Sequence, residues 1–259
     1  MTIKIFAVPY GKTLGNEGTL VNENYFFTSE RESWLYADWL VSGIPHSCFY
    51  TNIPKEKRIL FITEPPEVTD YVKGMYYLEQ FGTVVSPYEI KGFTGKVIIS
   101  NPHIGWTAGR YSGPMSTVKK AIDYPIPDKS KNISIVTSLK HNTVYQKKRV
   151  KFLRAAQKYF GGELDCFGRE FNPIDDKLNA IAPYKYHIAI ENSRIPNYWT
   201  EKLTDAWAGW ALPIYCGDPT ILEQIPDRNG NTKHSATIST AWIHMEAISQ
   251  INGIGLVKL

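Results

Sequence analysis

The sequence is poor in cysteine. Its three cysteines, Cys48, Cys166 and Cys216, are far apart, odd in number and without a CxxC pair, which excludes a disulfide scaffold and a zinc ribbon. Long hydrophobic runs are also missing, since no window approaches the roughly 18 consecutive apolar residues of a membrane span. Residues 1–10 alternate apolar and polar side chains, unlike a signal peptide. We therefore expect a protein of the reducing cytoplasm, with its cysteines as reduced core residues.

Charge of one sign is not in large excess either. The chain has 29 Lys and Arg against 25 Asp and Glu, a net charge of +4 that permits an anionic partner without requiring one. This balance gives no support for nucleic-acid binding. Hydrophobic residues make up 43% and charged residues 21%, as in ordinary globular proteins, which argues against a disordered or collagen-like chain.

Short apolar runs rich in β-branched residues alternate along the chain with stretches of helical periodicity. We predict strands at residues 3–8, 58–62, 96–100, 133–138, 186–190 and 212–215. We predict helices at residues 32–41, 71–81, 145–160, 174–181 and 200–210. Strands that alternate with helices form parallel sheets, because parallel neighbours require a crossover connection and a helix is the usual one.

The composition changes once, in residues 123–132, where two prolines and a polar run interrupt both periodicities. We interpret this segment as a linker. Each half of the chain has its own series of strands and helices, which predicts an α/β protein of two Rossmann-like domains, residues 1–127 and 128–259, facing a central cleft. One long domain is the alternative.

The densest group of candidate functional residues begins after the predicted strand 186–190. Three polar residues follow it directly: Glu191, Asn192 and Ser193. Ligands of open α/β sheets bind at such carboxyl ends of strands. Farther along, Thr200 can cap a helix whose first turn holds Glu201 and Lys202, and free N–H groups beside a lysine suit a phosphate. The alternative is a strand exit followed by a capped helix with a solvated charge pair.

This segment resembles the signature of glycosyltransferase family 10, the α-1,3-fucosyltransferases, in the form of a soluble, bacterial-type member. The family motif runs Glu-Asn-Ser, a short loop, Tyr-x-Thr-Glu-Lys, a helix, and then Pro-Ile/Val-x-x-Gly. Ten residues match it in order: Glu191, Asn192, Ser193, Tyr198, Thr200, Glu201, Lys202, Pro213, Ile214 and Gly217. Upstream, Arg149-Val-Lys-Phe152 resembles the family's Arg-x-x-Phe helix start, and Leu164-Asp-Cys-Phe-Gly168 is similar to its Val-Asp-x-x-Gly strand end.

The resemblance implies a GT-B fold, with residues 1–127 as the acceptor-binding domain and residues 128–259 as the domain that binds the nucleotide sugar. It implies an inverting transfer of L-fucose from GDP-fucose to a hydroxyl of a glycan acceptor. The expected partners are the nucleotide sugar and the glycan, with no nucleic acid and no transmembrane segment, while peripheral contact with a membrane stays open. GDP-fucose is then the donor substrate and no cofactor is obligatory.

The resemblance also implies two catalytic residues. Glu64 follows the predicted strand 58–62 and corresponds to the glutamate held to be the family's general base. Glu201 is the second candidate. Taken alone, a glutamate at a strand exit is usually a solvated loop residue.

Five residues are implied to bind the donor: Arg149, Asn192, Tyr198, Glu201 and Lys202. Arg149 and Lys202 are expected to neutralise the leaving diphosphate, since a guanidinium forms paired hydrogen bonds with phosphate oxygens. Asn192 and Glu201 are expected near ribose or sugar hydroxyls, and Tyr198 near the pyranose and the β-phosphate.

We expect no obligatory metal. The chain has no Asp-x-Asp to hold a divalent ion, its six histidines are scattered, and His187 fits a buried core position. Two other functions stay open: a GT-B transferase that uses another nucleotide sugar, and a non-catalytic carbohydrate-binding protein on the same scaffold. The acceptor glycan and the oligomeric state are not readable from the sequence.

Overall fold

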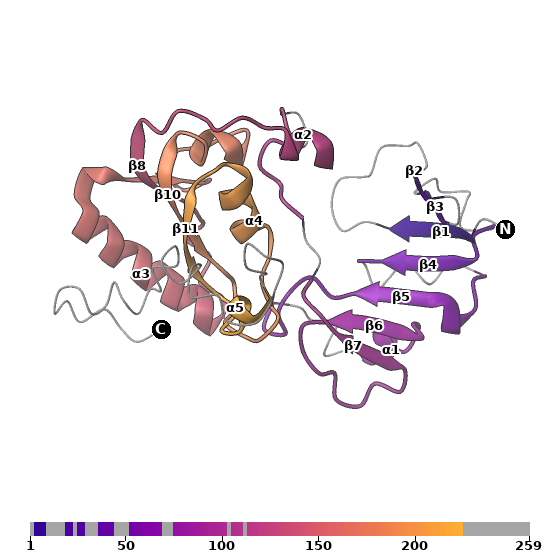
Figure 1. Cartoon of the computed structure of the whole chain (residues 1–259). Coiled ribbons are helices and arrows are strands. Elements are labelled where there is room, and N and C mark those ends of the chain that lie inside the picture. Colours follow the sequence, from indigo (N-terminus) through magenta and orange to yellow (C-terminus); the bar gives the residue numbers. More distant parts are fainter. Residues whose placement is uncertain are drawn as a thin grey trace. The chain divides into compact units, whose positions relative to one another are not determined.

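The computed structural model describes residues 3–8, 19–22, 25–28, 36–43, 52–68, 75–102, 105–110 and 113–224. The chain divides into two compact units, Met1–His103 and Ile104–Leu259. Each unit has its own sheet (Figure 1). The predicted α/β class, with a largely parallel sheet in each half, is confirmed.

The described part of the first unit contains a seven-stranded sheet in the order β2-β3-β1-β4-β5-β6-β7. Its strands are β1 (Ile3–Val8), β2 (Thr19–Asn22), β3 (Tyr25–Thr28), β4 (Trp39–Ser42), β5 (Arg58–Phe61), β6 (Thr83–Ser86) and β7 (Lys96–Ile99). Only the β2–β3 pair in this sheet is antiparallel. The 3₁₀ helix η3 (Lys55–Lys57) and the helix α1 (Met75–Leu78) complete the described elements of this unit.

The described part of the second unit contains a four-stranded parallel sheet in the order β11-β10-β8-β9. Its strands are β8 (Lys131–Val136), β9 (Leu164–Phe167), β10 (Tyr184–Ile190) and β11 (Leu212–Cys216). Its helices are α2 (Val118–Ile122), α3 (Val144–Phe160), α4 (Glu201–Ala208) and α5 (Ile221–Gln224), with the 3₁₀ helices η4 (Gly161–Glu163) and η5 (Lys177–Ala180).

The strand order of the second unit creates a topological switch point. β8 pairs with both β9 and β10, so the chain leaves β8 toward one side of the sheet and later returns to its other side. Open α/β sheets bind ligands at the carboxyl ends of the two strands that flank such a point. Here those strands are β8 and β10, which end at Val136 and Ile190.

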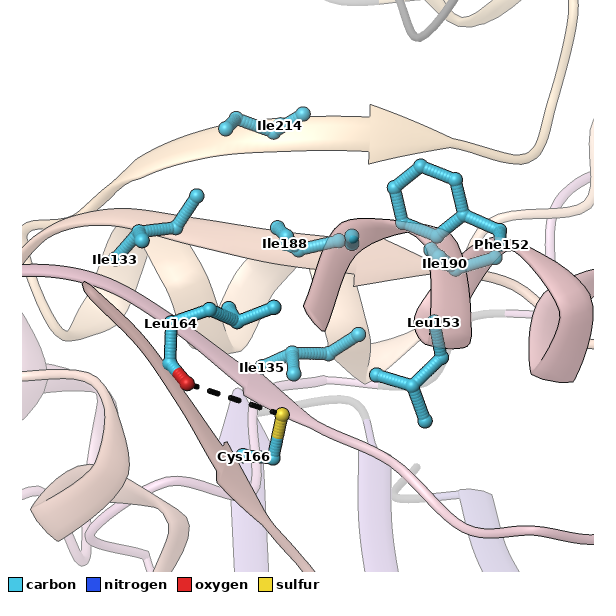
Figure 2. Close-up of a cluster of buried hydrophobic side chains, with 10 residues drawn as sticks. Ile133, Ile135, Phe152, Leu153, Leu164, Cys166, Ile188, Ile190 and Ile214 are labelled. Carbon is cyan, nitrogen blue, oxygen red and sulfur yellow. Dashed lines mark hydrogen bonds between the residues drawn. The ribbon is translucent and has the colours of Figure 1, made fainter. Parts of the chain in front are cut away.

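One hydrophobic cluster holds α3 against this sheet (Figure 2). The strands contribute Ile133, Ile135, Leu164, Cys166, Ile188, Ile190 and Ile214, and the helix contributes Phe152, Leu153 and Ala156. The helix residues follow the spacing of one helical face, which is why the periodicity of residues 145–160 predicted the helix. Cys166 is buried and free, as expected, whereas Cys216 is partly exposed and Cys48 lies outside the described residues.

The six predicted strands are confirmed, with ends that differ by at most two residues. Helices α3 and α4 confirm the predictions at 145–160 and 200–210, while the described parts of 71–81 and 174–181 form the short helices α1 and η5.

The helix predicted at 32–41 is wrong at its end, because Trp39–Ser42 is strand β4. Leu40 and Ser42 are buried between the parallel neighbours β1 and β5, so sheet pairing overrides the local helical periodicity. Residues 32–35 lie outside the described part.

The two units divide between His103 and Ile104, earlier than the predicted boundary at 127/128. The segment before the predicted linker packs on the second unit, where Ala108 and Met115 are completely buried. They form a cluster with Leu178, Ile181 and Ala211. The Lys129 ammonium, within the predicted linker, donates to the carbonyl oxygens of Ala182 (2.7 Å) and Gly209 (2.8 Å).

We predict that Gly168→Ala destabilises the second unit. Gly168 has a φ of 134°, and a Cβ there would overlap the carbonyl oxygen of Thr137. We expect the free energy of unfolding, measured with urea, to fall by about 2–4 kcal/mol. Gly162→Ala is the matched control, because a Cβ at Gly162 meets nothing within 4 Å. Equal stability of the two variants would contradict this account.

Candidate functional site

The guanidinium of Arg149 lies at the switch point of the second sheet. Arg149 Nη1 donates to Asn192 Oδ1 (2.8 Å), two residues after β10. Its Nη2 donates to the hydroxyl (3.3 Å) and carbonyl (3.5 Å) oxygens of Ser138, two residues after β8. The side chain therefore joins the carboxyl ends of the two strands at the place where ligands of such sheets bind.

The start of α3 determines where Arg149 lies. Thr143 caps the helix by accepting the N–H of Gln146 (3.1 Å), and the Gln146 side chain accepts the N–H of Thr143 (3.3 Å) in return. This capping box fixes the first turn, and Arg149 follows less than two turns later on the face that packs against the sheet.

The charge of Arg149 is only weakly compensated. The residue is 6% exposed, its hydrogen bonds go to neutral oxygens, and its Nε finds no partner among the described residues. Burial lowers the pKa of Arg149, while Glu191 and Glu170 act in the opposite direction through the electrostatic field. A buried cation with neutral partners favours the binding of an anion.

Glu191 organises the loop between β10 and α4. Its carboxylate, which is 2% exposed, accepts the N–H (2.7 Å) and the hydroxyl (2.8 Å) of Thr200 and pairs with the Lys202 ammonium (3.2 Å). Burial raises the pKa of Glu191, and Lys202 opposes that shift. Glu191 thus fixes Thr200, the N-cap residue of α4, and the helix turn that follows it.

Gly217 permits this arrangement. A Cβ at Gly217 would overlap both the Tyr215 hydroxyl and Cγ of Glu191. The glycine of the Pro-Ile-x-x-Gly pattern is therefore required by close packing on the buried glutamate of Glu-Asn-Ser. The two ends of the sequence pattern meet in space because β10 and β11 are parallel neighbours.

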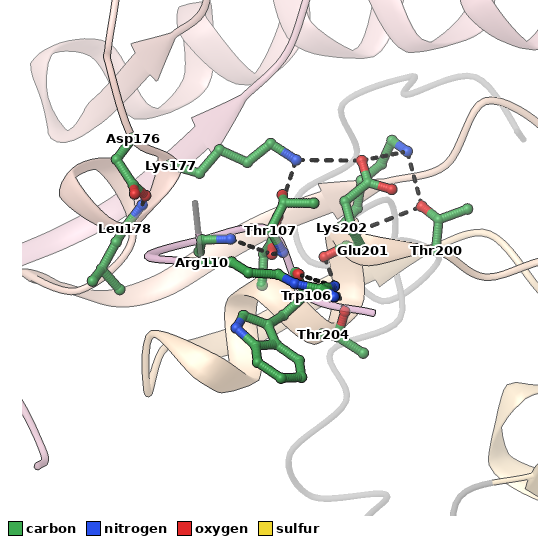
Figure 3. Close-up of polar contacts among 12 residues, drawn as sticks. Trp106, Thr107, Arg110, Asp176, Lys177, Leu178, Thr200, Glu201, Lys202 and Thr204 are labelled. Carbon is green, nitrogen blue, oxygen red and sulfur yellow. Dashed lines mark hydrogen bonds and ion pairs between the residues drawn. The ribbon is translucent and has the colours of Figure 1, made fainter. Parts of the chain in front are cut away.

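The first turn of α4 carries a network of charged residues (Figure 3). Glu201 Oε1 lies 3.3 Å from the ammonium groups of both Lys202 and Lys177. Lys177 also pairs with Asp205 Oδ2 at 3.0 Å. Burial alone would raise the pKa of Glu201, but Lys202, Lys177 and a hydrogen bond with Thr200 lower it to about 2. Glu201 is therefore ionised at neutral pH.

His187 is a core residue, as the sequence predicts. It is 3% exposed and its Nδ1 lies 2.8 Å from the Ser134 hydroxyl, which donates to the carbonyl oxygen of Ala180 (2.6 Å). Burial, together with the charge of Lys177, lowers the pKa of His187 to about 3. The imidazole is therefore neutral and belongs to the interior of the unit.

The structure brings four of the predicted site residues into two contacts: Arg149 with Asn192, and Glu201 with Lys202. Tyr198, in the loop that Glu191 organises, is 1% exposed. Glu64 belongs to the first unit, three residues after β5, and its carbonyl oxygen accepts the Tyr88 hydroxyl (3.2 Å). The roles of all six residues stay predictions.

Three charged residues at this site had no assigned role: Glu191, Lys177 and Asp205. The sequence marks Glu191 as a motif residue, but its role depends on the contact with Thr200, nine residues later, whose N–H it accepts in the structure. Lys177 and Asp205 are separated by 28 residues and come from different elements, so no local spacing marks their contact.

Within the described residues, no group of three or more His, Cys, Asp or Glu side chains could hold a metal ion. No helix in that same part of the chain combines the length and apolar character that a membrane crossing requires.

The second unit is thus an open parallel α/β sheet with a buried arginine at its switch point, the place where nucleotide-binding sheets of this kind hold their ligands. Residues 126–229 match the model of the C-terminal domain of glycosyltransferase family 10 (fucosyltransferase). The predicted resemblance to this family is confirmed for residues 126–229.

Curated relatives match part of the chain. The 4-galactosyl-N-acetylglucosaminide 3-alpha-L-fucosyltransferase FUT6 of Homo sapiens is 33% identical over 72 residues, which are 27% of this chain and 20% of that protein. The 3-galactosyl-N-acetylglucosaminide 4-alpha-L-fucosyltransferase FUT3 of Bos taurus is 31% identical over 120 residues, 45% of this chain and 30% of that protein. The match thus spans less than a third of the length of either relative.

Among solved structures, the chain is similar to a crystal structure of an alpha1,3-fucosyltransferase, with a TM-score of 0.49 and 14% identity over 96% of this chain and 76% of that one. A crystal structure of an alpha1,3-fucosyltransferase with GDP-fucose gives a TM-score of 0.47 and 15% identity over 86% of this chain and 70% of that one.

We predict that the ionisation of Glu201 makes the free energy of unfolding depend on pH in the acid range. Its folded pKa of about 2 lies below the ordinary value of 4.5, so its contribution is complete above about pH 4.5 and is lost as the pH falls through about 2. Between pH 5 and 2.5, the free energy of unfolding should therefore fall further in the wild type than in Glu201→Gln. Glu191 is present in both proteins; burial and the charge of Glu201 raise its pKa, so its titration opposes that of Glu201. Parallel pH profiles would refute the prediction.

Proposed function

We propose that this chain is a fucosyltransferase that moves L-fucose from GDP-fucose to a hydroxyl of a glycan acceptor, with inversion at the anomeric carbon. The observation that carries this proposal is the buried Arg149 with its neutral partners at the switch point of a family 10 domain. The diphosphate of GDP is an anion of the kind that such a guanidinium binds with paired hydrogen bonds.

In this mechanism the second unit binds the leaving group. Arg149 and Lys202 neutralise the charge that develops on the diphosphate as the bond to the anomeric carbon breaks. The Lys202 ammonium now contacts Thr200 Oγ1 (2.9 Å), Glu201 and Glu191. A diphosphate oxygen would replace at least one of these partners, so Lys202 has to turn partly away from the carboxylates when the donor binds.

Hydroxyl groups of the donor require both hydrogen-bond donors and acceptors. Asn192 offers an amide with both, and Glu201 is an ionised acceptor. In the proposed function these two side chains bind ribose or sugar hydroxyls, and Tyr198 lies near the pyranose and the β-phosphate.

Glu64 is the proposed general base. Its carboxylate removes the proton of the acceptor hydroxyl while that oxygen forms a bond to the anomeric carbon. The oxygen attacks from the face opposite the diphosphate, whose bond breaks with its electron pair, and this geometry inverts the anomeric centre. The step needs neither redox chemistry nor a covalent enzyme intermediate.

We predict that Arg149→Met weakens GDP binding by about 100-fold, the size of a lost bidentate charge-assisted contact. Titration calorimetry measures the affinity, and the exposed cation Lys151 on the same helix gives the control Lys151→Met. Unchanged affinity in Arg149→Met would refute the assignment. Titrations with GDP-mannose and UDP sugars distinguish another nucleotide-sugar donor from GDP-fucose.

We predict that Glu64→Gln lowers the turnover of fucosyl transfer by about 10²–10⁴-fold while GDP binding stays as in the wild type. Release of GDP from GDP-fucose is followed with a 4-galactosyl-N-acetylglucosaminide acceptor, the substrate that the names of several relatives specify. Wild-type turnover in Glu64→Gln would remove Glu64 as the base. Glycan binding without any turnover in the wild type would favour a non-catalytic carbohydrate-binding protein.

A further inference from the structure

Three consecutive backbone amides at the start of the second unit are held by two carboxylates. Asp205 Oδ1 accepts the N–H groups of Thr107 and Ala108, the latter at 2.8 Å, and Asp205 Oδ2 accepts the Thr107 hydroxyl (2.8 Å). Asp176 Oδ1 accepts the N–H of Gly109 (2.7 Å). Asp205 is on α4 and Asp176 caps η5, so these bonds fix the segment 107–109 on both elements.

Lys177 lies between Asp205, which binds the segment 107–109, and Glu201 of the candidate site (Figure 3). Its ammonium pairs with Asp205 Oδ2 at 3.0 Å and with Glu201 Oε1 at 3.3 Å. The Asp205 side chain is 2% exposed and the Lys177 side chain 31%. One cation therefore bridges a buried structural carboxylate and a carboxylate that the proposed function places at the donor.

The two carboxylates depend on Lys177 to different degrees. Asp205 accepts three further hydrogen bonds from Thr107 and Ala108, so its oxygens keep partners without the lysine. Glu201 has two cations within ion-pair distance among the described residues, Lys177 and Lys202. If Lys202 turns to a diphosphate, Lys177 is the cation that stays at the Glu201 carboxylate.

We propose that Lys177 is a positioning residue of the donor site, which orients the Glu201 carboxylate toward a donor hydroxyl while Lys202 binds the diphosphate. This inference rests on the proposed function and adds a residue to its site. Asp205 in turn fixes Lys177 and joins it to the segment 107–109, through which the chain enters the second unit.

The test uses steady-state kinetics with GDP-fucose on the wild type, Lys177→Met, Lys177→Gln and Lys177→Arg. We expect the KM for GDP-fucose to rise about tenfold in the two neutral variants, with a smaller change in kcat, since a binding contact weakens. Lys177→Arg should restore most of the affinity because it keeps the charge. The control is Lys119→Met, which removes an exposed ion pair with Asp123 and should behave like the wild type.

A pH profile separates positioning from a structural effect. Lys177→Met removes one of the charges that lower the pKa of Glu201 against the effect of burial, so that pKa rises from its wild-type value and the acid limb of kcat/KM should move to higher pH. The other groups that face this pair stay in place: Lys202 and Thr200 beside Glu201, Glu191 behind Lys202, and Asp205 and the neutral His187 beside Lys177. Lys177→Arg should return the limb to its wild-type position.

The outcomes are distinct. A folded neutral variant with wild-type KM and a wild-type acid limb overturns the role of Lys177, and so does Lys177→Arg that is as impaired as Lys177→Met. Urea denaturation shows which variants are folded. If both neutral variants are unfolded, the kinetics of Lys177→Arg against the wild type decide the question. A wild type that neither binds GDP nor transfers fucose removes the proposed function itself, whereas an active wild type with unaffected variants removes this inference alone.

Discussion

The buried charge of Arg149 is the constraint on which the site depends. Arg149 is 6% exposed, and a guanidinium with hydrogen bonds only to neutral oxygens is costly to keep in a protein interior. Its position between the carboxyl ends of β8 and β10 makes that cost useful, because an anion bound there would compensate the charge. In the proposed function, part of the affinity for a diphosphate comes from a cation that the fold leaves weakly compensated.

The carboxylates near Arg149, those of Glu191 and Glu201, have charged partners, unlike the guanidinium. Glu191 is buried completely, but its oxygens are occupied by Thr200 and Lys202 and its neighbour Gly217 has no side chain. This carboxylate therefore acts as part of the framework: it fixes the loop after β10 and the beginning of α4. Glu201, one helix position after the cap, is ionised and held between two lysines. Two glutamates ten residues apart thus have different environments.

The sequence predicts those elements whose pattern is local. Strands β8, β10 and β11 have apolar β-branched residues, and α3 and α4 have a periodic apolar face behind a threonine cap, so their positions follow from the residues themselves. β4 could not be predicted, because Leu40 fits a helical stripe equally well and only the pairing with β1 and β5 decides. Contacts such as that of Arg149 with Asn192, 43 residues apart, depend on strand order. The resemblance to a family identifies the residues of such contacts in the sequence. Only the fold shows that they lie close together.

A crystal structure with bound GDP tests the central claim most directly. We expect diphosphate oxygens within hydrogen-bond distance of the Arg149 guanidinium, its Nε included, at the carboxyl ends of β8 and β10. A nucleotide bound at another place, with Arg149 still donating only to Asn192 and Ser138, would contradict the account.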